Sequence, residues 1–256
     1  MKNKIFFTGG FIKSGTTLVQ KMLDIHPEIC CKKEQDLNTL LKLFITEGES
    51  LKPFVDGFNL KNYFPLMIEK ILANNCNKKL MGLKDNKFLL ENIDEIFQIF
   101  EGVKIIFIVR NPIDNLLSWW DHHLRLLDLG LVYKNFDQHD FLISRAITWS
   151  KLNERIISSS QYYPSDILIV RYEDILAHKG EMLEKICSFL DVNLNKKITD
   201  DIIKRTAFSK MKNDSKDPNF YKKARSDFGK SSILDNEIKL KIKAITQKER
   251  EHLNYL

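Results

Sequence analysis

The stretch FFTGGFIKSGTTL, residues 6–18, decides the expected fold, because it is close to a phosphate-binding loop between a strand and a helix. In ATP- and GTP-binding proteins this loop reads G-x-x-x-x-G-K-[ST]. Gly10 and Gly15 have the spacing of the two glycines, and Thr17 stands at the Ser/Thr position. Thr16 occupies the place of the lysine, and the only lysine in the loop is Lys13. The loop therefore keeps the frame of a phosphate site without the residue that usually reaches a γ-phosphate.

The residues around the loop favour a site for an oxyanion. Residues 4–8 form a short run typical of a buried strand, and apolar residues follow Gly15 at helical spacing. A strand, a tight turn and a helix N-terminus direct backbone N–H groups and the positive end of the helix dipole to one point. Thr16 and Thr17 add hydroxyl donors, and Lys13 adds a charge. The alternative is an ordinary strand–turn–helix corner that binds nothing.

The composition indicates a globular protein whose ligand is a small anion. The chain has 256 residues, of which 43% are hydrophobic and 29% charged, and its formal net charge is +6. This charge is mild and the lysines are spread along the chain, so no nucleic-acid partner is expected. The length fits one large domain, and we expect a single domain over residues 1–256.

The cysteines and the apolar runs bear on the compartment. The four cysteines form no Cys-x-x-Cys motif, so we expect free thiols in a reducing compartment. No group of His, Cys and carboxylates has metal-site spacing, and no metal is expected. The N-terminal apolar run is too short for a secretory signal, and no run is long enough for a membrane span. These features predict a cytoplasmic protein.

Strands and helices alternate along the chain. Besides residues 4–8, the runs 79–83, 104–109 and 167–170 read as buried parallel strands. Helical patterns cover residues 88–100, 141–159 and 182–190. This alternation predicts an α/β fold with three layers, α/β/α, around a mainly parallel sheet. Residues 48–78 and 128–140 are read as irregular, substrate-facing insertions, and the lysine-rich tail after residue 196 has no clear strand.

A second group of candidate ligand residues follows the run 104–109. Pro112 suits the first turn of a helix, because that position needs no N–H group. Ser118 lies eight residues after Arg110, about two turns into that helix. Arg110 and Ser118 could converge on one phosphate, since arginine binds such groups in a bidentate manner. The alternative is a strand-end arginine that pairs with a carboxylate.

A third group, Arg171-Tyr172-Glu173-Asp174, follows the run 167–170. Tyr172 could stack on a nucleotide or form a hydrogen bond with it. For Glu173 and Asp174 the preferred interpretation is structural, as residues that cap the next helix.

Together, the three groups resemble the sulfotransferases that use 3′-phosphoadenosine 5′-phosphosulfate. The resemblance covers about residues 4–190 and extends to the text after the loop, residues 22–27, and to residues 186–190. It implies a fold like that of the P-loop nucleotide kinases, without Mg²⁺. It also implies that the 5′-phosphosulfate is held by the loop residues Lys13, Ser14, Gly15, Thr16, Thr17 and Leu18. Arg110 and Ser118 would hold the 3′-phosphate, Tyr172 would lie near the nucleotide, and the product would be 3′,5′-adenosine bisphosphate (PAP).

The resemblance also implies catalytic residues for transfer of a sulfuryl group to an acceptor hydroxyl or amine. Lys13 would stabilise charge on the leaving 5′-phosphate, and Lys84 matches a lysine that approaches the transferring group. Relatives that act on small phenols place a histidine shortly after that lysine, but residues 82–87 contain none. Relatives that act on protein tyrosines or glycosaminoglycans use a glutamate that falls on Glu34. Glu34 is therefore the expected general base, with His122 in reserve.

The chain departs from the family at the turn that closes the nucleotide site. The family has an Arg-Lys-Gly-like turn followed by Gly and Trp, and the nearest text here, residues 225–230, reads RSDFGK. Arg225 can be placed on the arginine of that turn, whereas the first Gly and the Trp are missing.

Two other functions stay open at this point. One is a catalytically inactive protein that binds PAP, and the other is a P-loop kinase or NTPase, which would bind ATP with Mg²⁺. The expected partners are the nucleotide donor and a hydroxyl-bearing acceptor, with homo-oligomerisation left open. A glutamate base favours carbohydrate or peptide hydroxyls over small phenols by analogy.

Overall fold

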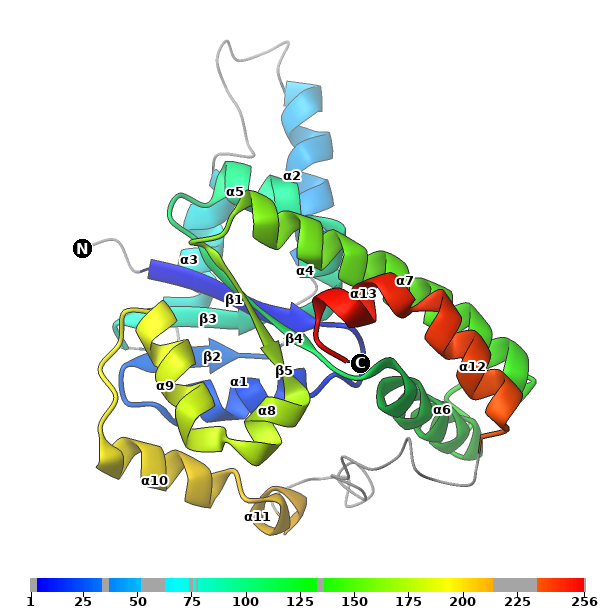
Figure 1. Cartoon of the computed structure of the whole chain (residues 1–256). Coiled ribbons are helices and arrows are strands. Elements are labelled where there is room, and N and C mark those ends of the chain that lie inside the picture. Colours follow the sequence, from blue (N-terminus) through cyan, green and yellow to red (C-terminus); the bar gives the residue numbers. More distant parts are fainter. Residues whose placement is uncertain are drawn as a thin grey trace.

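The computed structural model describes residues 4–33, 37–51, 63–73, 76, 78–132, 136–213 and 234–255. Within them, five strands form a sheet in which every pair of neighbours is parallel. The spatial order is β2-β3-β1-β4-β5, which places β1 at the centre (Figure 1). The strands are β1 (Lys4–Gly10), β2 (Ile29–Lys32), β3 (Leu80–Lys84), β4 (Lys104–Val109) and β5 (Ile167–Arg171).

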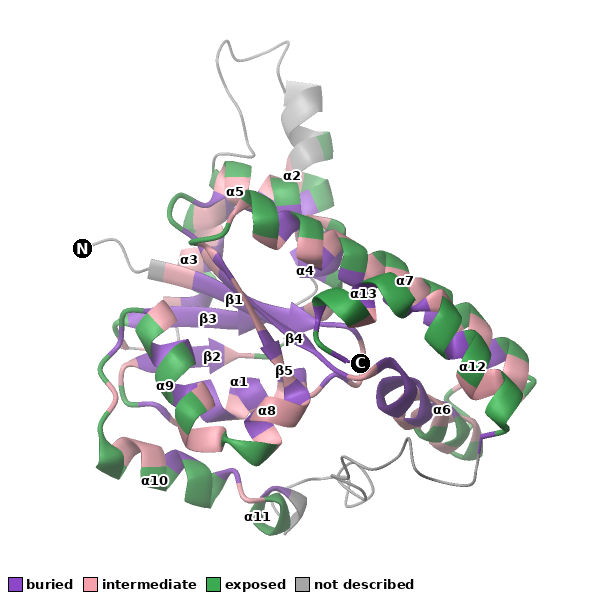
Figure 2. Ribbon diagram, viewed as in Figure 1, coloured by how far each residue is buried: buried purple, intermediate pink, exposed green. Residues whose placement is uncertain are grey.

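The sheet is buried on both faces, as its near-continuous apolar strands predict. Successive side chains of a strand point to opposite faces. In β4, Ile105 and Phe107 join one hydrophobic cluster, whereas Ile106 and Ile108 join a second cluster across the sheet. Figure 2 shows the central strands as almost wholly buried. The expected three-layer α/β/α fold is confirmed.

Two sets of helices form the outer layers (Figure 1). The first cluster contains residues of α2 (Leu37–Leu51), α3 (Phe64–Ala73), α4 (Asn86–Glu91), α5 (Ile93–Ile99) and α7 (Gln138–Tyr162). The second contains residues of α1 (Thr16–Ile25), α8 (Tyr172–Ala177), α9 (Lys179–Phe189) and α10 (Lys196–Arg205).

A third hydrophobic cluster lies beside the sheet and includes the fully buried Trp149 of α7. It joins α7 to α6 (Pro112–Asp128) and α12 (Asn236–Ile245), and the helix α13 (Gln247–His252) also contacts α7. The short helix α11 (Phe208–Asn213) follows α10. Among the helices of the described residues, none combines the length and the apolar character that crossing a membrane requires.

Several expected boundaries differ from the structure. The four predicted strands are present, but β2 was not expected, because its four residues are too few to show a strand pattern. The predicted helix 88–100 is two helices, α4 and α5, which meet at Asn92. There the Asn92 side-chain amide donates to the Phe88 carbonyl, 2.8 Å away. The prediction that residues 48–78 are irregular is wrong for residues 48–51, which end α2, and for residues 64–73, which form α3. The helix α7 begins inside the segment 128–140.

The end of α1 is fixed by His26, whose side chain is fully buried. Its Nδ1 accepts from the Glu28 N–H, 3.2 Å away, so its Nε2–H donates to the Asn193 carbonyl, 2.9 Å away. Burial lowers the pKa of His26, although the hydrogen bond to Asn193 and the charge of Glu28 oppose that shift. The folded protein therefore holds this imidazole neutral.

This arrangement predicts a stability that falls as the pH falls. The folded pKa of His26 lies below its ordinary value of 6.5, so below that pH the unfolded chain takes up a proton that the folded chain resists. The free energy of unfolding should be highest above about pH 6.5 and should decrease towards about pH 5. The free energy of unfolding, measured by urea denaturation at each pH, should change less steeply with pH in His26→Gln than in the native chain. His252→Gln, at an exposed position, is the control. If the free energy of unfolding of His26→Gln changed with pH as steeply as that of the native chain, His26 would not be the cause.

Candidate active site

The predicted site residues meet at the edge of the sheet where β1, β3, β4 and β5 end. This edge is where ligands bind in parallel α/β sheets. A cavity of about 370 Å³ opens there. Its lining includes nine of the predicted residues: Lys13, Gly15, Thr16, Thr17, Leu18, Lys84, Arg110, Ser118 and Tyr172. The volume falls within the range of small-molecule sites in proteins.

The loop between β1 and α1 depends on its glycines. Gly15, immediately before α1, has a φ of 97°, in the left-handed region that favours glycine. A Cβ at Gly15 would overlap the ring of Tyr172, and one at Gly10 would overlap the Ile108 carbonyl oxygen of β4. The loop is therefore pressed against the ends of β4 and β5, with the N-terminus of α1 facing the cavity.

Gly15→Ala is expected to lower both stability and nucleotide affinity. The left-handed conformation alone should cost about 1–2 kcal/mol with an alanine, and displacement of the Tyr172 ring adds to that cost. Gly130 is the matched control, because its φ is also positive, at 67°, but a Cβ there meets nothing within 4 Å. Urea denaturation and calorimetry with PAP should show a larger loss of stability for Gly15→Ala than for Gly130→Ala, and a loss of affinity only in Gly15→Ala. Equal losses in the two variants would refute this account.

Arg110 links the loop to the strand β4. Its side chain is buried, and Nη1 donates to the Lys13 carbonyl oxygen at 3.1 Å. Its guanidinium carbon lies 4.7 Å from the centre of the Tyr172 ring, in a cation–π contact. The next residue, Asn111, caps α6 by accepting from the Ile113 N–H, and Pro112 begins the helix as expected. Ser118 of α6 lines the same cavity, so the predicted convergence of Arg110 and Ser118 is present.

Tyr172 has a packing role in addition to its place in the cavity wall. Burial raises the pKa of its phenol, while the charge of Arg110 opposes the shift, so the side chain is neutral. The following residue, Glu173, accepts from the Asn111 N–H at 3.0 Å and from the Tyr255 hydroxyl at 2.8 Å. Glu173 therefore joins the start of α6 to the C-terminal segment, a structural role.

One predicted loop residue, Ser14, is not among the residues that line the cavity. Ser14 is fully buried, its hydroxyl has no hydrogen-bond partner among the described residues, and its backbone N–H donates to the Phe11 carbonyl oxygen. Glu34 and Arg225 both lie outside the described residues.

The two neighbouring histidines of α6 have different surroundings. His122 lines the cavity with Ser118, and its Nδ1 accepts from Nη2 of Arg125, 2.7 Å away. His123 is buried and packs against the rings of Trp120, Phe136 and Phe141. His123 is therefore a packing residue. The lone pair on Nδ1 of His122 is already used by Arg125, so this nitrogen cannot accept a proton from an acceptor.

The far side of the cavity comes from elements whose residues were not predicted. Lys179 of α9 lines it, and its Nζ donates to the Thr206 carbonyl oxygen, 3.2 Å away. Burial lowers the pKa of Lys179. The loop after α10 and the helix α11 add Thr206, Phe208 and Met211. A lysine, a threonine and two apolar residues carry no recognisable motif, so only the tertiary structure could assign them to the site.

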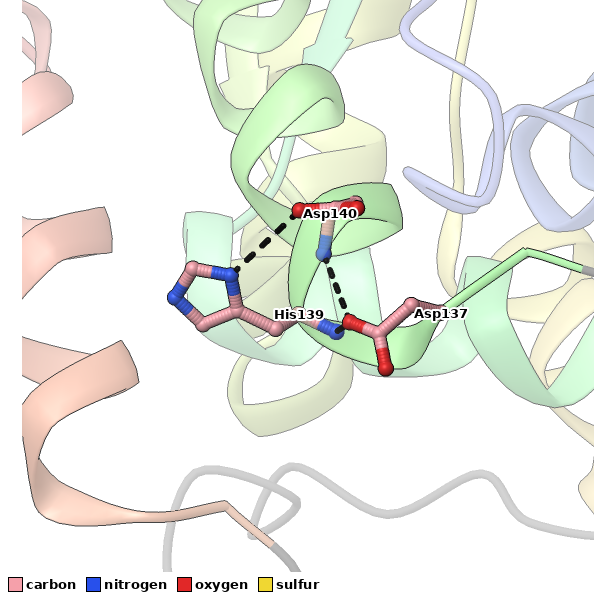
Figure 3. Close-up of side chains that lie close together, drawn as sticks. All are labelled: Asp137, His139 and Asp140. Atoms are coloured by element: carbon pink, nitrogen blue, oxygen red, sulfur yellow. Dashed lines mark hydrogen bonds and ion pairs between the residues drawn. The ribbon is translucent and has the colours of Figure 1, made fainter.

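One group of possible metal ligands occurs in the described residues, although none was expected. Ligand atoms of Asp137, His139 and Asp140 lie within 4.8 Å of one another at the start of α7. The Asp137 carboxylate caps the helix by accepting from the N–H groups of His139 and Asp140 (Figure 3). Nδ1 of His139 lies 3.7 Å from the Asp140 carboxylate. Helix capping and an ion pair therefore account for this group.

Comparison with known proteins identifies the class. A model of the sulfotransferase family matches residues 6–196, and the chain belongs to this family. It is 26% identical over 207 residues to a protein-tyrosine sulfotransferase of Drosophila melanogaster, and 23% identical over 202 residues to protein-tyrosine sulfotransferase A of Caenorhabditis elegans. Each match covers 75% of this chain, but only 38% and 51% of these relatives. The chain thus spans about half the length of these relatives, or less.

Solved structures support the fold. Mouse sulfotransferase SULT7A1, complexed with PAP, superposes with a TM-score of 0.67 over 98% of this chain and 86% of its own, at 16% identity. The sulfotransferase domain of the Synechococcus PCC 7002 olefin synthase gives a TM-score of 0.61 over 96% and 93%, at 18% identity. The resemblance inferred from the three groups of residues is therefore confirmed as family membership, with a P-loop-like fold.

Proposed function

We propose that this chain, as a single domain over residues 1–256, transfers a sulfuryl group from 3′-phosphoadenosine 5′-phosphosulfate to an acceptor hydroxyl or amine. The observation that carries the proposal is that one cavity brings the loop residues and Lys84 together with Arg110 and Ser118. The donor carries anionic groups at its 5′ and 3′ ends, and these residues provide cationic and hydroxyl groups for both. Relatives of the same fold, including the mouse enzyme, have been solved with PAP.

The cavity wall suits such a ligand. The absence of a Cβ at Gly15 lets the Tyr172 ring pack against the loop, and the N-terminus of α1 directs N–H groups towards the cavity. Lys13 and Lys84 line the same wall and would stabilise the charge that develops on the leaving 5′-phosphate, in the manner of an oxyanion hole. The bound donor supplies the sulfuryl group.

We assign removal of the acceptor proton to Glu34. His122 is the weaker candidate, because Arg125 occupies its Nδ1 and because it lines the cavity beside Ser118, on the side assigned to the 3′-phosphate. Asn38, which follows Glu34 closely in the sequence, lines a second cavity next to the nucleotide cavity.

A thermal-shift experiment tests the proposal. PAP and ATP are each added in the presence of EDTA or of Mg²⁺, at about 100 times the Kd. Binding at that concentration stabilises a protein by about 2.7 kcal/mol, which should raise the melting temperature by several degrees. We expect stabilisation by PAP with EDTA. Stabilisation by ATP with Mg²⁺ alone would instead indicate a kinase or NTPase, and PAP binding without any transfer would indicate an inactive nucleotide-binding protein.

A further inference from the structure

A second cavity of about 660 Å³ adjoins the nucleotide cavity, and the two share Ile12 and Asn86 in their walls. Its volume is typical of a site for a drug-sized ligand. The wall comes from the loop after β1, the start of α4, and the helices α2, α6 and α7. Most of its surface is apolar, contributed by Phe11, Ile12, Leu90, Trp119 and Leu152.

Most polar side chains of this wall already have partners within the protein. Three of them form such bonds: Asn38 donates to Glu91 at 2.7 Å, Asp85 accepts from the Phe88 N–H at 3.0 Å, and Thr148 donates to the Ser144 carbonyl at 3.0 Å. Lys87 is exposed. A sugar or a peptide backbone brings many polar groups, each of which loses free energy when it is buried without a partner. The wall therefore favours a ligand with an apolar body.

Asn86 is the exception among the amide, carboxyl and hydroxyl groups of the wall. Its Oδ1 is buried and has no hydrogen-bond partner among the described residues. Within the described part of the chain no hydrogen bond fixes this amide, so rotation about its terminal torsion can turn either the oxygen or the NH₂ group towards the cavities. Because Asn86 lines both cavities, a group bound to its amide would lie where the two cavities meet.

We propose that the second cavity holds the acceptor, that this acceptor is a small alcohol or phenol with an apolar body, and that Asn86 binds its hydroxyl. This inference rests on the proposed sulfuryl transfer and adds the acceptor class. The apolar wall favours this class over the carbohydrate or peptide hydroxyls that the analogy with glutamate-based relatives favours. The apolar body lies against Trp119, Leu90 and Leu152, and the Asn86 amide turns the hydroxyl towards the nucleotide cavity. An amide has no useful basicity, so Asn86 orients the hydroxyl and the base is a separate residue.

The transfer step forms one bond to sulfur and breaks another. The acceptor oxygen forms the new O–S bond while the S–O bond to the 5′-phosphate breaks. The electron pair of that bond stays on the 5′-phosphate of PAP, next to Lys13 and Lys84. The acceptor proton passes to the carboxylate assigned as base, Glu34.

The acceptor class is tested by direct binding and by transfer. Naphthol, an unbranched fatty alcohol, a disaccharide and an acidic tyrosine peptide are titrated calorimetrically into the full chain saturated with PAP. The same compounds are then offered as acceptors with labelled donor. We expect naphthol or the fatty alcohol to bind and to be sulfated with a kcat/KM at least about tenfold above that of the disaccharide and the peptide. This ratio corresponds to about 1.4 kcal/mol. Transfer to the disaccharide or peptide in preference, or no binding of either apolar compound, would overturn the acceptor class.

The role of Asn86 is tested by Asn86→Ala. Loss of one hydrogen bond to a neutral hydroxyl should lower kcat/KM for the preferred acceptor roughly three- to tenfold. Because Asn86 also lines the nucleotide cavity, affinity for PAP is measured without acceptor, and the loss of kcat/KM should exceed any loss of PAP affinity. Asn236→Ala is the matched control, because it removes an exposed amide at the start of α12 that lines neither cavity, and its kcat/KM should be unchanged. Equal kcat/KM values for Asn86→Ala and the native chain would refute the role of Asn86.

Failure of this inference can be separated from failure of the proposed function. If the native chain does not bind PAP, the proposed sulfuryl transfer itself is wrong. If the chain binds PAP and sulfates only the disaccharide or the peptide, the proposed function stands and the apolar acceptor is wrong.

Discussion

Glu34→Gln is expected to abolish sulfuryl transfer and to leave PAP binding intact. The amide of glutamine has nearly the shape of the carboxylate but cannot take the acceptor proton. A general base contributes typically about 10²–10⁴-fold to the rate, so turnover should fall by a factor in that range. Single-turnover transfer with labelled donor measures the loss, and calorimetry with PAP measures the binding.

Two further variants make this result specific. Glu28→Gln removes a carboxylate six residues earlier in the sequence that forms an ion pair with Lys79 at 3.2 Å, and its activity should stay close to that of the native chain. His122→Asn removes the reserve base and should retain most of the turnover. Unchanged turnover in Glu34→Gln, together with a large loss in His122→Asn, would transfer the role of base to His122.

Arg110→Ala is expected to weaken PAP binding by about 10- to 150-fold. A hydrogen bond to a charged group contributes about 1.5–3 kcal/mol, and the guanidinium is assigned to the 3′-phosphate. Arg110 also supports the Lys13 carbonyl and packs over Tyr172, so its loss loosens the loop as well. Isothermal titration with PAP gives the affinity.

Two controls separate these contributions. Arg110→Lys keeps the charge but loses the planar fork, and should recover only part of the affinity. Arg155→Ala removes an arginine that donates to the Leu90 carbonyl and lies in neither cavity lining, and its affinity for PAP should be unchanged. If Arg110→Ala and Arg155→Ala lost the same affinity for PAP, and if added salt removed the difference from the native chain, only net charge would matter.

The strands that end at the site could be predicted because they are continuous apolar runs with short functional sequences behind them. The run 104–109 agrees with β4, and the residue after it, Arg110, lines the site as expected. The strand β2 and the helix α3 could not be predicted in this way. The four residues of β2 form a strand by pairing with β3, and this pairing depends on the tertiary fold.

The sequence by itself determined which residues of the strand ends line the first cavity. Gly10, Gly15, Arg110 and Tyr172 have fixed spacings relative to strand ends, and parallel strands bring such ends to one edge. Only the tertiary structure decided which other residues share that edge. Lys179 and Phe208 reach the cavity because α9 and α11 pack there, and Asn86 lies between two cavities because the end of β1 packs against the start of α4. The physical reason is that backbone conformation is encoded locally, whereas a cavity is formed by side chains that are distant along the chain.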